Sequence, residues 1–363
     1  MKITVVGAGI VGCAIAHELA CRGARVEIID SRGVGRGATR ASAGILAPQI
    51  EGHTPELRSL AACSLAMYDE FIRRVESDSR RSVEYSRSGT LQVALDDAEA
   101  QALASDAKSL RAAGVECSLM TGDEARRMEP QLSAATAAAL LVPIHGFVGA
   151  APLTEALAEA ARAHGVRVST STVLAIDAQS RTPRVTTEDG VIDSDAVIVA
   201  SGSWPVRSRP GDPPQVKPIR GQLLKLRCDE LVASRVIWGQ ACYVVPWSDG
   251  TVLVGATVED VGFDERPTVE GVRTLLSAGI ALLPQIAGAH FEEVRVGFRP
   301  KTSDELPMIG PSDSMPGVFY ALGHYRNGVL LAPLTASLMA DLVLDRRERP
   351  ELAPVRPGRL TQA

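Results

Sequence analysis

Residues 3–12 read Ile-Thr-Val-Val-Gly-Ala-Gly-Ile-Val-Gly, a short apolar run that enters a GxGxxG spacing. A helical pattern follows to about Cys21, and a second apolar run, residues 25–29, follows that. In this order Gly7 makes the tight turn, Gly9 lets a pyrophosphate approach the backbone and Gly12 lets the helix pack close on the strand. Glycines alone can cluster by chance, but the strand, turn, helix and strand together predict a βαβ unit that binds a dinucleotide.

Asp30 stands at the end of the second strand, near the offset of roughly 20 residues at which a carboxylate accepts from ribose hydroxyls. The negative charge of Asp30 argues against NADP, whose 2′-phosphate it would repel, but it does not distinguish NAD from FAD. The next stretch, residues 37–48 (GATRASAGILAP), is rich in small and hydroxyl side chains, so its slim backbone can lie against a flat ring system. A surface loop is the alternative; the apolar Ile45 and Leu46 favour contact with a cofactor.

A second anion-binding pattern lies near the C-terminus, where Gly-His-Tyr-Arg-Asn-Gly (323–328) precedes the apolar run 329–332. A helix N-terminus carries unpaired N–H groups and about half a positive charge. Arg326 adds a planar fork suited to a carboxylate. The segment could be only a strand-to-helix turn with a solvated arginine, but the N-terminal unit favours a binding role.

Composition sets limits on the class of protein. The chain has 363 residues, 45% of them apolar and 22% charged, with a net charge of -5. This fits a globular protein of two domains and argues against nucleic-acid binding or a polybasic membrane patch. No apolar stretch has the length of a membrane span and no signal peptide is apparent, so we expect a cytoplasmic location. The six cysteines and six histidines show no metal-binding spacing, so we expect reduced thiols and no metal.

The second half of the chain has the pattern of an antiparallel sheet. A Gly/Pro-rich stretch, residues 205–218, is a plausible crossing between domains. Residues 219–296 alternate in β fashion, with a hairpin formed by 241–246 and 251–257 around Ser-Asp-Gly. Alternation on this hairpin lets Tyr243 face the cofactor cleft while its neighbours point into the core.

Seven motifs together resemble the D-amino-acid-oxidase-like flavoproteins, and within them the glycine oxidases of the thiamine pathway. They are GAGIVG, GATRASAGIL, ASGSW, KPIRGQ, GATVEDVGFD, VGFRPKTSDELPMIG and GHYRNG, and they span nearly the whole chain. The resemblance implies an α/β fold with a Rossmann-like FAD-binding domain and an α+β substrate domain on an antiparallel sheet. The implied FAD domain comprises residues 1–84, 145–215 and 297–363, and the substrate domain 85–144 and 216–296.

The resemblance also implies which residues bind. FAD, held non-covalently, would contact Gly7, Gly9, Ile10, Val11, Gly12, Asp30, Ser31, Ala38, Thr39, Ala43, Gly44, Ile45, Val173, Ser201, Gly202, His324, Tyr325, Arg326, Asn327, Gly328, Val329 and Leu330. The substrate carboxylate would be held by Tyr243, Arg299 and Arg326.

Alternatives stay open for three of these residues. Arg299 could be a salt-bridge partner of Asp304 or Glu305, and Tyr243 a core tyrosine. His324 is expected to offer its backbone to the cofactor and not to act as an acid or base. Two departures from the family pattern stand out: Asp30 is one methylene shorter than the usual glutamate, and Val258 occupies a pocket-wall position where longer side chains are common.

The implied activity is FAD-dependent oxidative deamination of glycine, sarcosine or small D-amino acids. Hydride would pass from Cα to flavin N5, giving imine or glyoxylate, ammonia and hydrogen peroxide, with no protein acid or base. The resemblance also implies a homotetramer and a link to thiazole synthase in thiamine biosynthesis. Two alternatives stay open: a dehydrogenase passing electrons to a quinone or partner subunit, and a non-catalytic flavin-binding protein, which the two candidate arginines disfavour.

Overall fold

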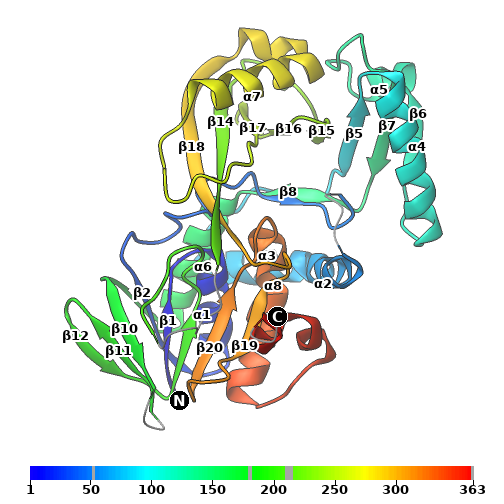
Figure 1. Cartoon of the computed structure of the whole chain (residues 1–363). Coiled ribbons are helices and arrows are strands. Elements are labelled where there is room, and N and C mark those ends of the chain that lie inside the picture. Colours follow the sequence, from blue (N-terminus) through cyan, green and yellow to red (C-terminus); the bar gives the residue numbers. More distant parts are fainter. Residues whose placement is uncertain (51–53, 179–181, 209–215, 361–363) are drawn as a thin grey trace.

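A computed structural model describes residues 1–50, 54–178, 182–208 and 216–360. Two large sheets lie one above the other, and the long strands β14 and β18 run from the upper sheet toward the lower one (Figure 1). The predicted crossing at 205–218 lies partly outside the described residues.

The lower sheet contains the predicted βαβ unit. Its six strands follow the order β19-β20-β13-β1-β2-β9, and all neighbours are parallel except β19 and β20. The strands are β1 (Lys2–Val6), β2 (Arg25–Asp30), β9 (Arg167–Thr170), β13 (Ala196–Val199), β19 (Met308–Pro311) and β20 (Val318–Leu322). Successive side chains alternate between two apolar cores, so the sheet is buried on both faces, as parallel sheets require.

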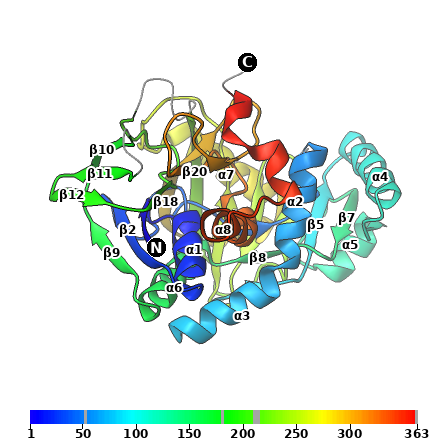
Figure 2. The ribbon, with the colours of Figure 1, turned by 90° about the horizontal axis from the view of Figure 1, so that it is seen from below.

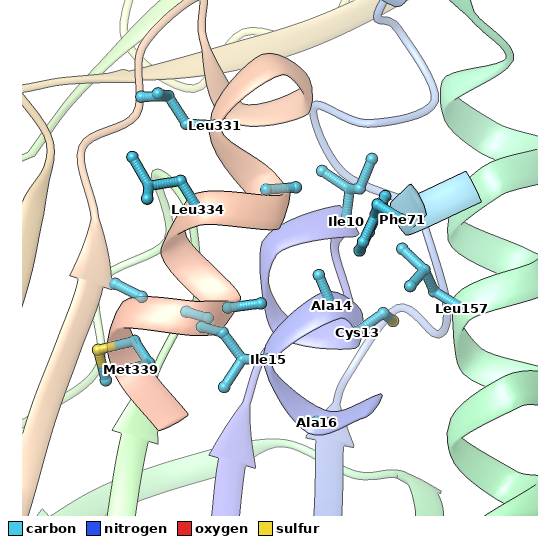
Figure 3. Close-up of a cluster of buried hydrophobic side chains, with 14 of the residues drawn as sticks. Ile10, Cys13, Ala14, Ile15, Ala16, Phe71, Leu157, Leu331, Leu334 and Met339 are labelled. Carbon is cyan, nitrogen blue, oxygen red and sulfur yellow. The ribbon is translucent and has the colours of Figure 1, made fainter. Parts of the chain in front are cut away.

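Helices cover one face of this sheet. They are α1 (Ile10–Cys21), α2 (Pro55–Ala66), α3 (Tyr68–Ser79), α6 (Ala150–Ala163) and α8 (Gly328–Leu344). Helix α1 is central, with Leu331 and Met339 of α8 on one side and Leu157 of α6 on the other (Figure 3). Its small residues allow neighbours to approach on both sides. The helix predicted to end at about Cys21 agrees with the observed bounds of α1.

The other face of the lower sheet packs against a small antiparallel sheet of β10 (Val173–Asp177), β11 (Arg184–Thr187) and β12 (Gly190–Asp193).

The upper sheet has eight strands in the order β18-β14-β17-β16-β15-β5-β7-β6, antiparallel except at β15 and β5. They are β5 (Thr90–Ala94), β6 (Ser118–Thr121), β7 (Ala138–Val142), β14 (Lys217–Arg227), β15 (Val236–Trp238), β16 (Tyr243–Pro246), β17 (Thr251–Gly255) and β18 (His290–Lys301). The predicted hairpin is β16 and β17. A three-stranded sheet of β3 (Ile45–Leu46), β8 (Gly146–Val148) and β4 (Tyr85–Ser86) lies between the two large sheets (Figure 1).

One expectation for this region was wrong, because residues 219–296 include a helix. Helix α7 (Val269–Leu282) covers the upper sheet and places Leu275 and Leu282 on the core, at helical and not strand spacing. Thr268 caps it by accepting from the Gly271 N–H. Helices α4 (Asp97–Ala112) and α5 (Gly122–Met128) lie at the far edge of the sheet, and short 3₁₀ turns occupy Pro284–Gly288, Pro350–Val355 and Pro357–Leu360. Within the described ranges, no helix has the length and apolarity needed to cross a bilayer.

Candidate functional site

A cavity of about 800 Å³ lies between the carboxyl ends of the lower strands and one face of the upper sheet. All the residues predicted to bind cofactor or substrate line it, except Gly12. Gly12 acts from outside: a Cβ there would lie 2.0 Å from the Gly7 carbonyl oxygen, so only glycine lets α1 approach the turn. The fold thus brings together residues from both ends of the chain, such as Gly7 and Leu330.

Two helix N-termini line the cavity. The residues before α1 and α8, Gly9 and Asn327, make no side-chain capping hydrogen bond. Thr39 of the small-residue loop accepts from the Ile10 N–H at 3.2 Å, which fastens that loop beside the start of α1. The remaining N–H groups are suited to electron-rich groups of a ligand, the pyrophosphate at α1 and an oxygen-bearing ring edge at α8.

Asp30 lines the cavity and also accepts hydrogen bonds from the protein backbone. Its carboxylate accepts from the backbone N–H groups of Ala8 at 2.8 Å, Arg32 at 2.8 Å and Gly33 at 3.0 Å. These bonds tie the glycine turn to the end of β2. A carboxylate has about four lone-pair sites, so three protein donors leave capacity for a ribose hydroxyl.

His324 is held in a neutral state. It is buried, its Nε2 lies 3.1 Å from the Thr335 hydroxyl, and burial lowers its pKa to about 4. The next residue, Tyr325, has a φ of +47° and donates its N–H to the Pro300 carbonyl at 2.8 Å. Both residues line the cavity, and a backbone contact of His324 with the cofactor stays a prediction.

Two of the three candidate substrate residues, Arg299 and Tyr243, share one face of the upper sheet. Arg299 pairs with Ile219, Tyr243 with Gly255, and Gly255 with Leu223 in the strand register, so their side chains project to the same side. Gly221 lies on this face between Ile219 and Leu223. A Cβ on Gly221 would lie 2.5 Å from Arg299 Nη1, so the guanidinium rests directly over this glycine.

Arg299 forms no ion pair with either of the two acids that follow it in the sequence, because each acid pairs with another residue. Asp304 pairs with Arg359 at 2.7 Å, and Glu305 pairs with Lys301 at 2.6 Å. Arg299 itself donates to the Thr257 carbonyl at 2.9 Å and, more weakly, to the Arg220 carbonyl at 3.4 Å. Among the described residues it has no carboxylate partner, which leaves guanidinium donors available to an anion in the cavity.

Arg326 is more peripheral. It is exposed at the cavity lining, and its guanidinium carbon lies 5.1 Å from the centre of the Tyr325 ring. The ring also receives Lys301, whose Nζ lies 5.3 Å from its centre. This position fits a cation that flanks a bound anion more than one that encloses it.

Sequence reasoning missed an aromatic and ionic group at the same cavity. Trp204 stacks on Phe263 at 4.8 Å and meets Phe298 edge-on at 6.0 Å. The Arg32 guanidinium lies 5.2 Å from the Trp204 ring and pairs with Glu265 at 2.8 Å. These contacts join the end of β2 to the loop after β17. The three aromatic residues lie in the motifs ASGSW, GATVEDVGFD and VGFRPKTSDELPMIG, but the sequence gives no sign that they meet.

The same loop, residues 256–268, is held from behind by the other face of β14. Arg220 is 3% exposed, pairs with Glu259 and donates to the carbonyls of Asp264 and Arg266. Alternation along KPIRGQ thus directs Gly221 to the cavity and Arg220 to the loop. Val258, on this loop, lines the cavity as the family pattern predicted.

A family model described as FAD dependent oxidoreductase (DAO) matches residues 2–342. The chain belongs to this family. FAD is therefore its cofactor, and the uncapped helix N-termini, the glycine turn and the slim loop at 37–48 provide the cradle that this group needs.

Individual proteins agree with the family. The chain is 36% identical to a glycine oxidase of Geobacillus kaustophilus, over 97% of this chain and 95% of that protein. It is 33% identical to a bifunctional ThiO/ThiG protein of Nostoc over 97% of its own length but spans only 54% of that relative. The crystal structure of the Geobacillus kaustophilus glycine oxidase superposes with a TM-score of 0.93 at 34% identity, covering 98% of both chains.

Proposed function

We propose that this protein oxidatively deaminates glycine and other small amines or amino acids, such as sarcosine and small D-amino acids, with oxygen as electron acceptor. An FAD-dependent amine or amino-acid oxidoreductase is the class to which its relatives belong. The observation that carries the finer assignment is Arg299. This residue is half-buried and lies on the cavity face of β18. Its guanidinium has no carboxylate partner among the described residues.

In the proposed complex Arg299 binds the substrate carboxylate, the Tyr243 hydroxyl donates to it, and Arg326 lies beside the pair. Fixing the carboxylate fixes Cα, and such orientation can contribute roughly 7 to 11 kcal/mol to rate in favourable cases. FAD, when bound, supplies the two-electron acceptor. The start of α8 stabilises negative charge on the cofactor edge that it faces.

No side chain is required as base if the substrate amine is neutral, because its lone pair assists removal of hydride from Cα. The neutral state of His324 fits this scheme, since a charged imidazolium in the same wall would repel the guanidinium pair. Two glycines, Gly221 and Gly255, and the short Val258 keep the wall around the carboxylate site slim. We infer room for substrates somewhat larger than glycine.

The test is a substrate panel on the purified yellow protein, with flavin absorbance followed without oxygen and peroxide measured in air. Arg299→Ala should lose most reduction by glycine or sarcosine, and Arg326→Ala should lose less. Arg295→Ala, on the same strand but paired with Glu293 at 2.7 Å and outside the cavity lining, is the matched control. Retained turnover in Arg299→Ala would refute the substrate assignment, and a larger loss in Arg326→Ala would refute the ranking.

The acceptor is tested in the same experiment. Rapid reoxidation by oxygen with stoichiometric peroxide supports an oxidase. Reduction by substrate followed by slow reoxidation, with turnover restored by a quinone, would instead identify a dehydrogenase.

The proposal extends to pathway and assembly. The ThiO/ThiG relative joins a region similar to this chain to a second part in one polypeptide, which supports a role in supplying the imine of glycine for thiazole synthesis. We propose a homotetramer and the two-domain division given above on the family resemblance. Light scattering of the holoenzyme tests the first, and limited proteolysis with mass analysis tests the second.

A further inference from the structure

Four metal-ligating side chains meet on the far side of the cofactor domain. His17 and Cys21 lie one turn apart on one face of α1, Asp78 lies near the end of α3, and His164 follows α6. One ligand atom from each residue lies within 4.8 Å of all the others. Helix α1 begins at the cavity with Ile10, and His17 and Cys21 follow 7 and 11 residues later, so this cluster lies roughly 10–17 Å along the helix from the cavity.

The distances from the Asp78 carboxylate to the other three ligand atoms are close to the distances between ligand atoms around a bound metal ion. Asp78 Oδ2 lies 2.7 Å from His17 Nε2, 3.1 Å from His164 Nε2 and 3.9 Å from Cys21 Sγ. Tetrahedral Zn²⁺ with ordinary bond lengths separates its ligand atoms by roughly 3.3–3.6 Å. The three distances from Asp78 would change by roughly 0.2–0.6 Å to reach these values, and the other ligand-atom separations are at most 4.8 Å.

We propose that His17, Cys21, Asp78 and His164 bind a divalent transition metal, with Zn²⁺ the best match. Two imidazoles, one thiolate and one carboxylate are ligands typical of zinc. The thiolate and the carboxylate together balance the two charges of the ion. This site is independent of the proposed activity, and it departs from the sequence expectation of no metal.

The surroundings favour a ligand role over isolated side chains. His17 is fully buried, and burial lowers the pKa of its imidazole, so the ring is neutral and donates its Nε2–H to the Asp78 carboxylate. A metal bound at Nε2 would displace this proton to Nδ1, which has no hydrogen-bond partner among the described residues and can take it. Burial raises the pKa of the Cys21 thiol to about 11, and a metal would remove this proton. The nearby Arg74 is paired with Glu18, which limits its repulsion of a cation.

A bound ion would join three helices that do not follow one another in the chain. Helix α6 packs against both α1 and α3, and all three lie side by side when the molecule is seen from below (Figure 2). His164 has a side chain 37% exposed and Asp78 22% exposed, which gives an ion a route from solvent. The metal would act as a structural clip at the back of α1.

The experiment uses the holoenzyme, stripped with a chelator and then titrated with Co²⁺ or Zn²⁺. We expect one ion per chain, Co²⁺ bands in the visible region beyond the flavin absorption, and a rise in unfolding temperature with Zn²⁺. Cys21→Ser should lose the sulfur-to-cobalt charge-transfer band, and His164→Asn should weaken Zn²⁺ binding at least about tenfold. The matched controls are Cys63→Ser and His290→Asn, which change the same residue types outside the cluster.

His164 is partly exposed at a helix end, so its variant is expected to fold, and flavin content of the metal-free protein checks this. Failure of the wild-type protein to bind Co²⁺ or Zn²⁺ stoichiometrically would overturn the proposal. Binding by Cys21→Ser and His164→Asn at wild-type affinity would overturn it equally. Neither result bears on amine oxidation.

Discussion

Gly221→Ala tests the carboxylate site without altering any ligand-binding side chain. The new Cβ would lie 2.5–2.6 Å from Cζ and both terminal nitrogens of Arg299. Ordinary contact distances are about 3.5–4 Å, so the guanidinium must retreat by about 1 Å. The atoms that move form the end of a flexible side chain, and Gly221 has no positive φ, so stability should change little.

The cost should fall on substrate binding. Hydrogen bonds to charged groups contribute roughly 1.5–3 kcal/mol, which corresponds to about a 10- to 100-fold change in affinity. We therefore expect kcat/KM for glycine or sarcosine to fall about 10- to 100-fold, mainly through KM. Flavin content and unfolding temperature should stay near those of the wild type.

The assay is steady-state peroxide formation with the accepted substrate, together with the flavin spectrum and a thermal melt. The matched control is Gly288→Ala, because a Cβ at Gly288 meets nothing within 4 Å and its φ is not positive. If Gly221→Ala and Gly288→Ala both keep the wild-type KM, the position of the Arg299 guanidinium does not determine substrate binding, and the reasoning fails.

Three further outcomes concern residues in and around the cavity. Gly12→Ala places a Cβ 2.0 Å from the Gly7 carbonyl oxygen, a backbone atom that cannot easily move. We therefore expect the protein to lose roughly 1–3 kcal/mol of stability and to hold less FAD. Denaturant unfolding and flavin absorbance measure these two effects. Trp204→Ala removes ring contacts that join the two sides of the cavity, and FAD should dissociate about two- to tenfold more readily in an ultrafiltration assay. The pKa of His324 is about 4 in the folded protein and 6.5 in the unfolded chain. Between these values the unfolded state binds more protons, so the free energy of unfolding falls as pH drops from 6.5 toward 4, by up to about 3 kcal/mol. His324→Asn should flatten this acid limb in urea unfolding, whereas the exposed-histidine control His290→Asn should not; an unchanged slope in His324→Asn would contradict the assignment.

The N-terminal half of the cavity was predictable because its signals are local. The turn at 7–12 needs glycine for steric reasons that apply within six residues, and Asp30 follows one strand and one helix later. The small-residue loop and the turn before α8 were likewise identified by composition and order. The arginines were assigned through the family resemblance, and the register of β14 and β18 then shows why Arg299 reaches the cavity.

Helix α7 had a local signal in the Thr268 cap and the helical spacing of its buried residues, but the β pattern of the surrounding residues was extended across it. Other features have no local signal. The Arg32–Glu265 pair joins residues 233 positions apart, and the aromatic group around Trp204 also depends on the loop after β17 folding back. Asp30 has backbone donors on both oxygens, which a sequence pattern cannot reveal.

The sequence alone determined that a βαβ unit for a dinucleotide opens the chain and that a helix begins near Gly328, because glycine geometry and helix ends act over a few residues. The family resemblance identified the dinucleotide as FAD. Tertiary structure decided that Arg299 has no carboxylate partner within the described part of the chain, and that His17 and Cys21 meet Asp78 and His164. Those facts depend on which distant side chains become neighbours, and packing of whole helices and sheets sets that.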